Sequence, residues 1–256
     1  MAKRIGCVVF LFGLGWILGI AGADAAEGDR TSKPGDKIKV VILVGGHGYD
    51  AAGFDRLWSG YDDIAAEVWK GAPYTAFDDI GDFKFDAIVM YNLSSGITDT
   101  QKQNLLKLLD KGVGLVVWHH ALANCQGWPE FEKIAGGRFW MKPGDRGGVK
   151  VGKSGTGGGR VKMHIEDSKH PITSGIADFE IQDETYNRQT FTDDIHVLVS
   201  TDHPKSDKQI AWVKTYAKAR VFGYQTGHGP KTWANESFQR ILGQGIRWVA
   251  GRLPAK

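Results

Sequence analysis

The sequence predicts an α/β fold in which a mainly parallel sheet carries helices on both faces. Apolar runs at 38–46, 85–92 and 115–118 are typical of strands, and the nearly continuous β-branched run IKVVILVGG suits a strand buried on both faces of a parallel sheet. Segments with helical spacing, 54–69 and 98–112, alternate with these strands. Such alternation indicates βαβ units and therefore a layered α/β domain.

The two helical segments are predicted by different signals. The first is amphipathic, with apolar residues three and four positions apart, namely Phe54, Leu57, Tyr61, Ile64, Ala65 and Val68. In the second, Thr98 suits an N-cap, Gln101 stands at the capping-box position, and Gly112 suits a C-terminal stop.

The second half of the chain is less regular. Residues 138–160 are rich in glycine and basic residues, and we expect a surface loop or hairpin there, with a lid as one role. The GTGGG within it lacks the spacing of a phosphate-binding loop. Strands are predicted at 195–202, 208–216 and 219–227, the last two as a C-terminal β-hairpin, and 237–251 is predicted to be an amphipathic helix.

The N-terminus has the pattern of a targeting segment. A basic start, MAKR, precedes an apolar stretch of about 18 residues and the small residues ADA, which predicts a signal peptide over 1–25. An uncleaved membrane anchor is the alternative, because that length is the lower limit for spanning a bilayer. With 26–37 as a linker, the domain at 38–252 is expected to be exported, in the periplasm or secreted.

Charge and cysteine content exclude some classes of protein. Removal of Lys3, Arg4 and Asp24 with the signal peptide leaves 30 basic and 28 acidic residues, a net charge of +2. This balance argues against a nucleic-acid partner. Cys7 also leaves, so Cys125 has no partner for an internal disulfide. The oligomeric state stays open, a homodimer included.

Polar side chains follow three of the predicted strands at their carboxyl ends, where α/β folds bind ligands. His47 follows the first, Asn92 the second, and His119 with His120 the third. His47 and His228 both have glycine on each side, which allows a ligand to approach the backbone. We expect at least two of these histidines to share one pocket, with His119 rather than His120 facing it.

Several stretches resemble the ThuA-like (trehalose-utilisation) family, including GLVVWHHA, HPITSGIADFEIQDETYN and IAWVKTYAKARVFGYQTGHG. The resemblance runs over 38–252. It implies a flavodoxin-like three-layer fold related to class I glutamine amidotransferases, and a role with trehalose-like or 3-keto sugars. One departure is the turn AKAR at 217–220, where the family usually places glycine.

The resemblance also implies that a D-E-x-Y motif at 183–186 faces the same cleft. Glu184 near an imidazole could act as a general base or acid, and Tyr186 could donate to a sugar hydroxyl or stack on a ring. The alternative for 183–187 is a solvated turn. Trp118 and Trp233 offer aromatic surfaces of the kind that sugars use, although tryptophan is equally a core residue.

Glutaminase chemistry is not expected. It needs a thiolate at a sharp strand-to-helix turn, and the turn at 118–120 contains no cysteine. Cys125 lies downstream and is better interpreted as a small buried apolar residue, which leaves a Cys125-dependent amidohydrolase as a third hypothesis. A divalent metal held by His47, His119 and His228 is a minority hypothesis, because ligands from separate strand ends need no local motif.

The sequence therefore predicts an exported enzyme that hydrolyses or eliminates a small glycoside or 3-keto-sugar. A non-catalytic sugar-binding module is the alternative. The expected catalytic residues are Glu184, His119 and His228, and the expected substrate-binding residues are His47, Asn92, His120, Tyr186 and Trp233.

Overall fold

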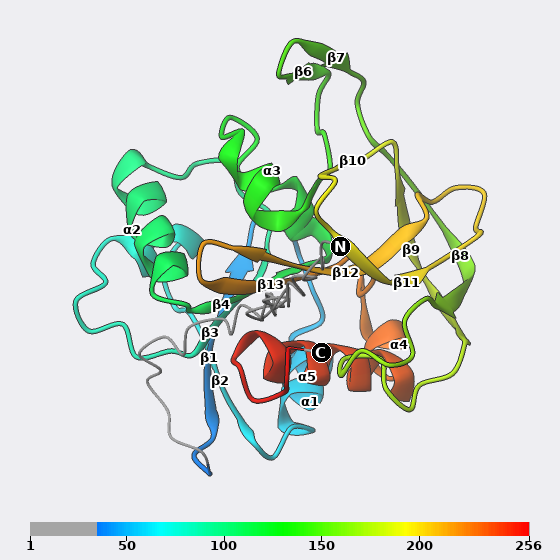
Figure 1. Cartoon of the computed structure of the whole chain (residues 1–256), viewed down its shortest axis with the longest axis horizontal. Helices are drawn as coiled ribbons and strands as arrows, with labels where there is room; N and C mark the ends of the chain where they lie inside the picture. The colour runs from blue at the N-terminus through cyan, green and yellow to red at the C-terminus, as the bar shows by residue number, and fades with distance from the viewer. Residues whose placement is uncertain (1–34, 256) are drawn as a thin grey trace, which may run out of the picture.

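A nine-stranded sheet forms the centre of the computed structural model, which describes residues 35–255. Its strand order is β2-β1-β3-β4-β13-β12-β11-β8-β9 (Figure 1). The first five strands run parallel; these are β2 (Ile64–Val68), β1 (Ile38–Gly45), β3 (Ala87–Asn92), β4 (Gly114–Trp118) and β13 (Ala219–Tyr224). The remaining four are antiparallel to their neighbours; these are β12 (Gln209–Tyr216), β11 (His196–Ser200), β8 (Gly155–Ile165) and β9 (Phe179–Asn187).

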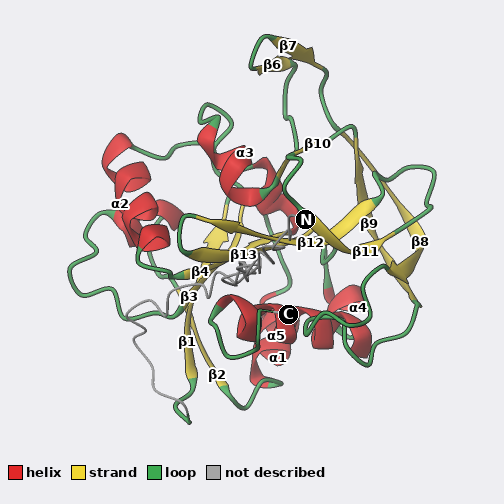
Figure 2. Ribbon diagram, viewed as in Figure 1, coloured by secondary structure: helices red, strands yellow, loops and turns green. Residues whose placement is uncertain are grey.

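Helices cover both faces of the parallel half, as the sequence predicts (Figure 2). One face packs against α1 (Ala51–Ser59), α4 (Pro230–Trp233) and α5 (Glu236–Val249). The other packs against α2 (Asp99–Asp110), α3 (Glu130–Ala135) and a 3₁₀ helix, η1 (Pro73–Phe77). Successive residues of β1 alternate between the two cores, with Val40 and Ile42 in one and Val41 and Leu43 in the other. The three-layer α/β prediction is confirmed.

The predicted capping of α2 is confirmed atom by atom. The Thr98 hydroxyl accepts from the Gln101 amide at 3.3 Å, and the Gln101 side chain accepts from the Thr98 amide at 2.9 Å. These two bonds satisfy donors that a helix N-terminus otherwise leaves unpaired. At the other end, Gly112 has a φ of 88°, a backbone conformation that suits glycine at a helix stop.

The predicted helix at 54–69 is wrong in its second half. Asp50 caps α1 by accepting from the Gly53 amide at 3.1 Å, and the helix ends at Ser59. Ile64–Val68 instead pairs with β1 as the parallel edge strand β2. Its apolar residues fit an alternating pattern as well as a helical one, and pairing with β1 decides between them.

The region expected to be a surface loop or hairpin contains a hairpin and the start of a long strand. A small hairpin, β6 (Gly144–Arg146) with β7 (Val149–Val151), projects from the body of the protein (Figure 1). The GTGGG run belongs to β8 and pairs with β9, so the expectation of a loop does not hold for these residues. Residues 183–187 lie on β9, so the solvated-turn alternative is also wrong. Two short strands, β5 (Gly137–Arg138) and β10 (Thr190–Phe191), form a separate pair.

The β12–β13 hairpin is confirmed, and it lies inside the main sheet. β13 pairs with β4 in parallel, so its carboxyl end reaches the same edge as those of β1, β3 and β4. The predicted signal peptide 1–25 and the linker up to residue 34 lie outside the described residues. Within 35–255, no helix combines the length and apolar character that crossing a membrane requires.

The AKAR turn identifies one strained residue. The pair Tyr216–Ala219 closes a two-residue loop, and Ala217 has a φ of 50°, which is costly for a residue with a β-carbon. Ala217→Gly should raise the free energy of unfolding by about 0.5–1 kcal/mol, the relieved strain exceeding the added chain entropy. Urea denaturation would measure this.

Lys218 is the matched control, because its φ is not positive. Lys218→Gly should lower the free energy of unfolding by about 0.5–1 kcal/mol through chain entropy alone. Equal effects of the two substitutions would contradict the strained turn.

Candidate active site

His119 stands at the sharp turn that follows β4. It begins a 3₁₀ helix, η2 (His119–Ala123), and its φ of 53° is unusual for a residue other than glycine. Its Nδ1 lies 2.7 Å from the carbonyl oxygen of Gln225. A carbonyl only accepts, so Nδ1 carries a proton and Nε2 is the ring nitrogen that faces the other side chains of the site. The backbone therefore fixes both the direction and the tautomer of this imidazole.

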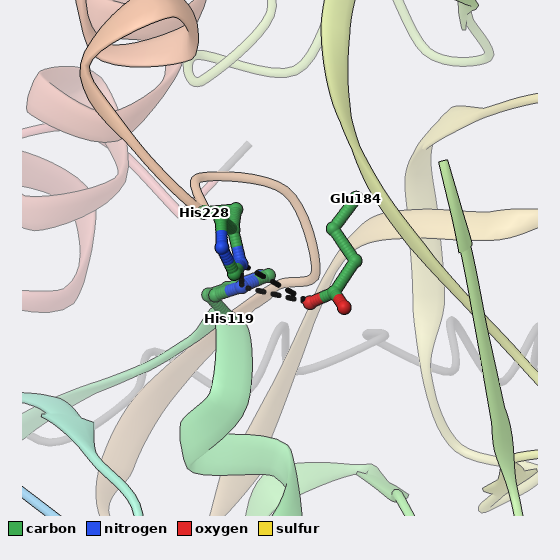
Figure 3. Close-up of side chains that lie close together, drawn as sticks. All are labelled: His119, Glu184 and His228. Atoms are coloured by element: carbon green, nitrogen blue, oxygen red, sulfur yellow. Dashed lines mark hydrogen bonds and ion pairs between the residues drawn. The ribbon is translucent and has the colours of Figure 1, made fainter. Parts of the chain in front are cut away.

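Three other side chains meet the Nε2 atom of His119, and two of them, His228 and Glu184, are drawn in Figure 3. The His228 Nδ1 lies 3.2 Å away and the Glu184 Oε2 lies 3.4 Å away. The Glu184 Oε2 is also 3.2 Å from the His228 Nδ1. The His119–Glu184–His228 cluster thus joins the end of β4, strand β9 and the loop after β13, as predicted for the three catalytic candidates.

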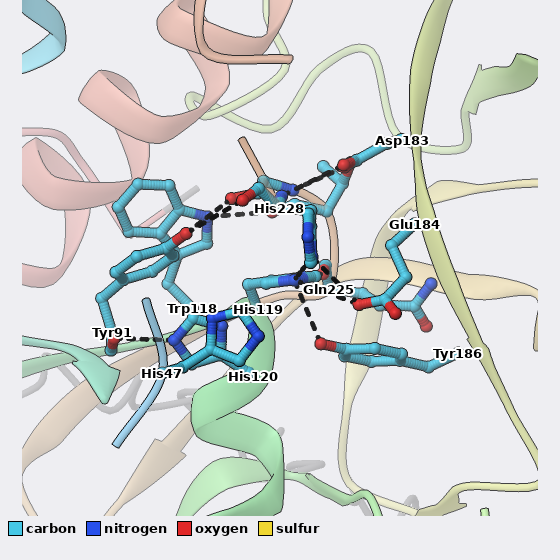
Figure 4. Close-up of polar contacts among 12 residues, drawn as sticks. His47, Tyr91, Trp118, His119, His120, Asp183, Glu184, Tyr186, Gln225 and His228 are labelled. Carbon is cyan, nitrogen blue, oxygen red and sulfur yellow. Dashed lines mark hydrogen bonds and ion pairs between the residues drawn. The ribbon is translucent and has the colours of Figure 1, made fainter. Parts of the chain in front are cut away.

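The carboxylate of Asp183 positions the loop that carries His228 (Figure 4). It accepts from the backbone amides of Gly227 at 2.6 Å and His228 at 3.1 Å, and from the Thr226 hydroxyl. Asp183 is buried, so these contacts act at low dielectric, where charge-assisted hydrogen bonds are strong. Adjacent residues of β9 thus divide two tasks, since Asp183 fixes the loop while Glu184 joins the cluster.

Aromatic side chains hold the carbonyls of the same loop. The Trp118 indole donates to the Thr226 oxygen and the Trp233 indole to the Gly227 oxygen, each at 2.8 Å. The Tyr91 hydroxyl also donates to the Gly227 oxygen, at 3.1 Å. Trp118 and Trp233 are buried in the core. The expectation that Trp233 offers an aromatic surface to the substrate is therefore contradicted, and its core alternative holds.

His120 and His47 form a second group beside the cluster. Their rings stack at 4.5 Å between centroids, and both line a cavity of about 490 Å³. His120 donates from Nε2 to the Tyr91 oxygen at 2.9 Å, and its buried Nδ1 has no hydrogen-bond partner among the described residues. Burial lowers the pKa of His120 to about 3, so this ring is neutral near pH 7. The cavity lining includes His120 and not His119, whose side chain is 1% exposed, so the expectation that His119 rather than His120 faces the pocket is wrong.

Glu184 and Tyr186 reach the same cavity from β9, together with Arg188 and the β8 residues Gly155 and Thr156. Burial raises the pKa of Glu184, but hydrogen bonds and charge from His119 and His228 outweigh it, and the net pKa is lower than usual. Glu184 is therefore a carboxylate near neutral pH. Burial raises the pKa of Tyr186, so its hydroxyl, 3.1 Å from the His119 Nε2, stays protonated.

Two further predictions need correction. Asn92 is fully buried and pairs its side-chain oxygen with the Asn124 amide at 3.1 Å, so it supports the turn and does not line the cavity. The predicted metal set is also changed. The donor atoms that lie within 4.8 Å of one another belong to His119, Glu184 and His228, and Glu184 takes the place assigned to His47.

Cys125 is not a nucleophile in this structure. Its side chain is buried among apolar residues and contacts the Tyr74 hydroxyl at 3.2 Å. Burial raises the pKa of the thiol to about 11, which disfavours the reactive thiolate. The turn where glutaminase chemistry would need its thiolate carries His119.

Sequence reasoning missed the residues that build the site around its reactive groups. Asp183 and Gln225 were not assigned roles, although both contact the catalytic candidates or their backbone. Asp183 carries one usable signal, because adjacent strand residues point to opposite sides and Glu184 was already placed in the cleft. Nothing local marks Gln225, whose contact to His119 is made by its carbonyl.

The sequence model of one family, ThuA, described as trehalose utilisation, matches residues 66–249. The chain belongs to the ThuA family. This membership associates the chain with carbohydrate-related function. No curated protein is significantly similar to it in sequence.

Solved structures share the ThuA-family fold at low identity. A ThuA-like protein from Parabacteroides merdae has a TM-score of 0.69 at 17% identity, over 86% of this chain and 92% of that one. One from Bacteroides uniformis has a TM-score of 0.64 at 20% identity, over 85% and 94%. A β-galactosidase from Rahnella sp. R3 has a TM-score of 0.53 at 10% identity, over 86% of this chain and 32% of that one. At these identities the similarity shows fold alone.

Removal of the Asp183 charge should loosen this ThuA-family site. Asp183→Asn places an amide against two backbone donors, and we expect a loss of about 2–3 kcal/mol in the free energy of unfolding. Urea denaturation would measure it. The matched control is Glu180→Gln, an exposed acid on the same strand, which should change stability by less than about 0.5 kcal/mol. A neutral Asp183→Asn would contradict the positioning role.

The native thiol of Cys125 should resist alkylation. A pKa two units above the usual value lowers the thiolate fraction about 100-fold, before burial restricts access further. Mass spectrometry after iodoacetamide treatment near pH 7.5 would report the rate, with guanidinium-unfolded protein as the control. Native alkylation as fast as that of the unfolded chain would revive the cysteine hypothesis.

Proposed function

We propose that this protein is an exported carbohydrate-active enzyme that cleaves a small glycoside or 3-keto-sugar by elimination or hydrolysis. The observation that carries the proposal is the position of Glu184. Its carboxylate lines an open cavity and at the same time contacts two imidazoles within 3.4 Å. A charged base beside groups that can relay or donate protons is what general acid–base catalysis needs.

The cavity supports a small polar substrate. Its volume of about 490 Å³ lies in the range that small-molecule sites occupy. Hydroxyl, cationic and imidazole groups line it next to the ring of Phe139; the polar residues are His47, His120, Lys153, Ser154, Thr156, Tyr186 and Arg188. Such a mixture suits a sugar, which presents hydroxyls at its edge and an apolar ring face. Family membership points to the same class of compound.

The chemistry of a 3-keto-glycoside fits these groups. The keto group acidifies the adjacent C2 proton, which Glu184 accepts directly or through a bound water. The released electron pair forms the C1–C2 double bond, the glycosidic C1–O bond breaks, and the departing oxygen takes a proton from an imidazole. In hydrolysis, water supplies the new C1–O bond and Glu184 takes its proton instead. The ionised state of Glu184 supports the role of base in both.

Export rests on the sequence of residues 1–25, a basic, apolar and small-residue pattern typical of a signal peptide. A cleaved and exported protein would meet its sugar outside the cytoplasm.

The proposal predicts the behaviour of Glu184→Gln. The substitution keeps size and hydrogen-bonding capacity but removes the base, so kcat/KM on a 3-keto-glycoside should fall by about 10²–10⁴. Release of the aglycone, followed by chromatography, would measure it. Glu180→Gln is the matched control, because this exposed acid lies on the same strand and should keep wild-type turnover.

Equal turnover by Glu184→Gln and the wild type would refute the assignment. Binding of an intact glycoside that stays unchanged after long incubation would favour the non-catalytic sugar-binding module instead.

A further inference from the structure

We propose that the His119–Glu184–His228 cluster binds one divalent transition-metal ion of the zinc type. This inference rests on the proposed function in treating the cluster as the reaction centre. It adds the cofactor that the centre would use. The protein ligands would be the His119 Nε2, the His228 Nδ1 and one carboxylate oxygen of Glu184.

The first argument is the spacing of the three donor atoms. Their separations are 3.2, 3.2 and 3.4 Å. Ligand atoms about 2.0–2.1 Å from a tetrahedral ion lie about 3.3–3.4 Å from one another. The three atoms therefore form nearly one face of a zinc coordination tetrahedron, while the cavity beside Glu184 leaves room for a further ligand.

The second argument is that the contacts within the cluster are too long for hydrogen bonds that share a proton and are better explained by a bound ion. Charge-assisted hydrogen bonds between nitrogen and carboxylate measure about 2.7–2.9 Å, and both nitrogen–carboxylate separations of the cluster, 3.2 and 3.4 Å, exceed that. Contacts just outside the cluster range from 2.6 Å between the Gly227 amide and Asp183 to 3.1 Å between the Tyr186 hydroxyl and the His119 Nε2. The nitrogen–carboxylate contacts within the cluster are longer than these surrounding contacts, as expected where a cation completes the centre.

The third argument is the support around the ligands. Metal-binding histidines generally donate their other ring N–H to a carbonyl or carboxylate, which fixes the tautomer. His119 does so through Gln225, and its side chain is only 1% exposed. His228 is held through its backbone by Asp183. Two nitrogens and one carboxylate oxygen suit a first-row transition metal better than Mg²⁺ or Ca²⁺, which prefer oxygen ligands.

A bound ion would polarise the keto oxygen of the substrate or lower the pKa of a coordinated water. Glu184 would then act through the ion and its water. Tyr186 and the His47–His120 pair would face the substrate in the cavity.

Isothermal titration of Zn²⁺ into EDTA-treated, dialysed mature protein tests the site without reference to activity. Wild type should bind one equivalent, and Co²⁺ in its place should give visible absorption bands of low-coordinate geometry. Glu184→Gln and His228→Gln should each weaken Zn²⁺ binding at least about 10-fold. His47→Gln is the matched control, because this neighbouring histidine lies outside the cluster, and it should bind as tightly as wild type.

Absence of one-equivalent binding by the wild type would overturn the inference, as would binding that survives both ligand substitutions. Weakening by His47→Gln to the same degree would also overturn the ligand set. The two proposals fail separately. If the protein binds Zn²⁺ but turns over no glycoside, the metal site stands and the proposed enzymatic function fails. If EDTA-treated protein that binds no Zn²⁺ shows full turnover, the enzymatic function stands and the metal site fails.

Discussion

The carboxylate of Asp183 is the contact on which the geometry of the site depends. It ties β9, at one edge of the sheet, to the loop that leaves β13 in its middle. The same loop receives the indoles of Trp118 and Trp233 on its carbonyls and offers the Gln225 carbonyl to His119. One buried charge thus sets the positions of Glu184 and His228 relative to each other. Because Asp183 is buried, its hydrogen bonds act at low dielectric and hold these positions rigidly.

The sharp turn after β4 is a backbone feature that can present different kinds of reactive side chain. In α/β-hydrolases, a sharp strand-to-helix turn presents a nucleophile. Here it presents the imidazole of His119, in a left-handed conformation that is costly for a residue with a β-carbon. This strained backbone conformation places the His119 side chain at the edge of the sheet in a fixed orientation. The hydrogen bond from the His119 Nδ1 to the Gln225 carbonyl fixes the rotation of the imidazole ring.

The elements that were predicted correctly are those whose signals lie within a short stretch of sequence. The capping box of Thr98 and Gln101 and the buried run of β1 need no distant partner to be recognised. The edge strand Ile64–Val68 was missed because its spacing fits two periods and only pairing with β1 separates them. Trp233 was misassigned for a similar reason, since burial against the loop, rather than residue type, decides its role. His119, Glu184 and His228 could be named from strand ends and family motifs, but their 3.2–3.4 Å spacing follows from a sheet order that the sequence does not display.

The β8–β9 ribbon is joined to the rest of the sheet by a short ladder. Only Val199–Ile165 and Ser200–His164 pair β11 with β8, while β8 and β9 pair with each other over nine residues. Glu184 and Tyr186 lie on this ribbon, whereas His119 and His228 belong to the main body of the protein. The site therefore spans the junction between the ribbon and the main body, and the Asp183 carboxylate joins the two sides. A ligand that contacts both sides would oppose opening between the ribbon and the main body, so ligand binding and the stability of this junction would be thermodynamically linked.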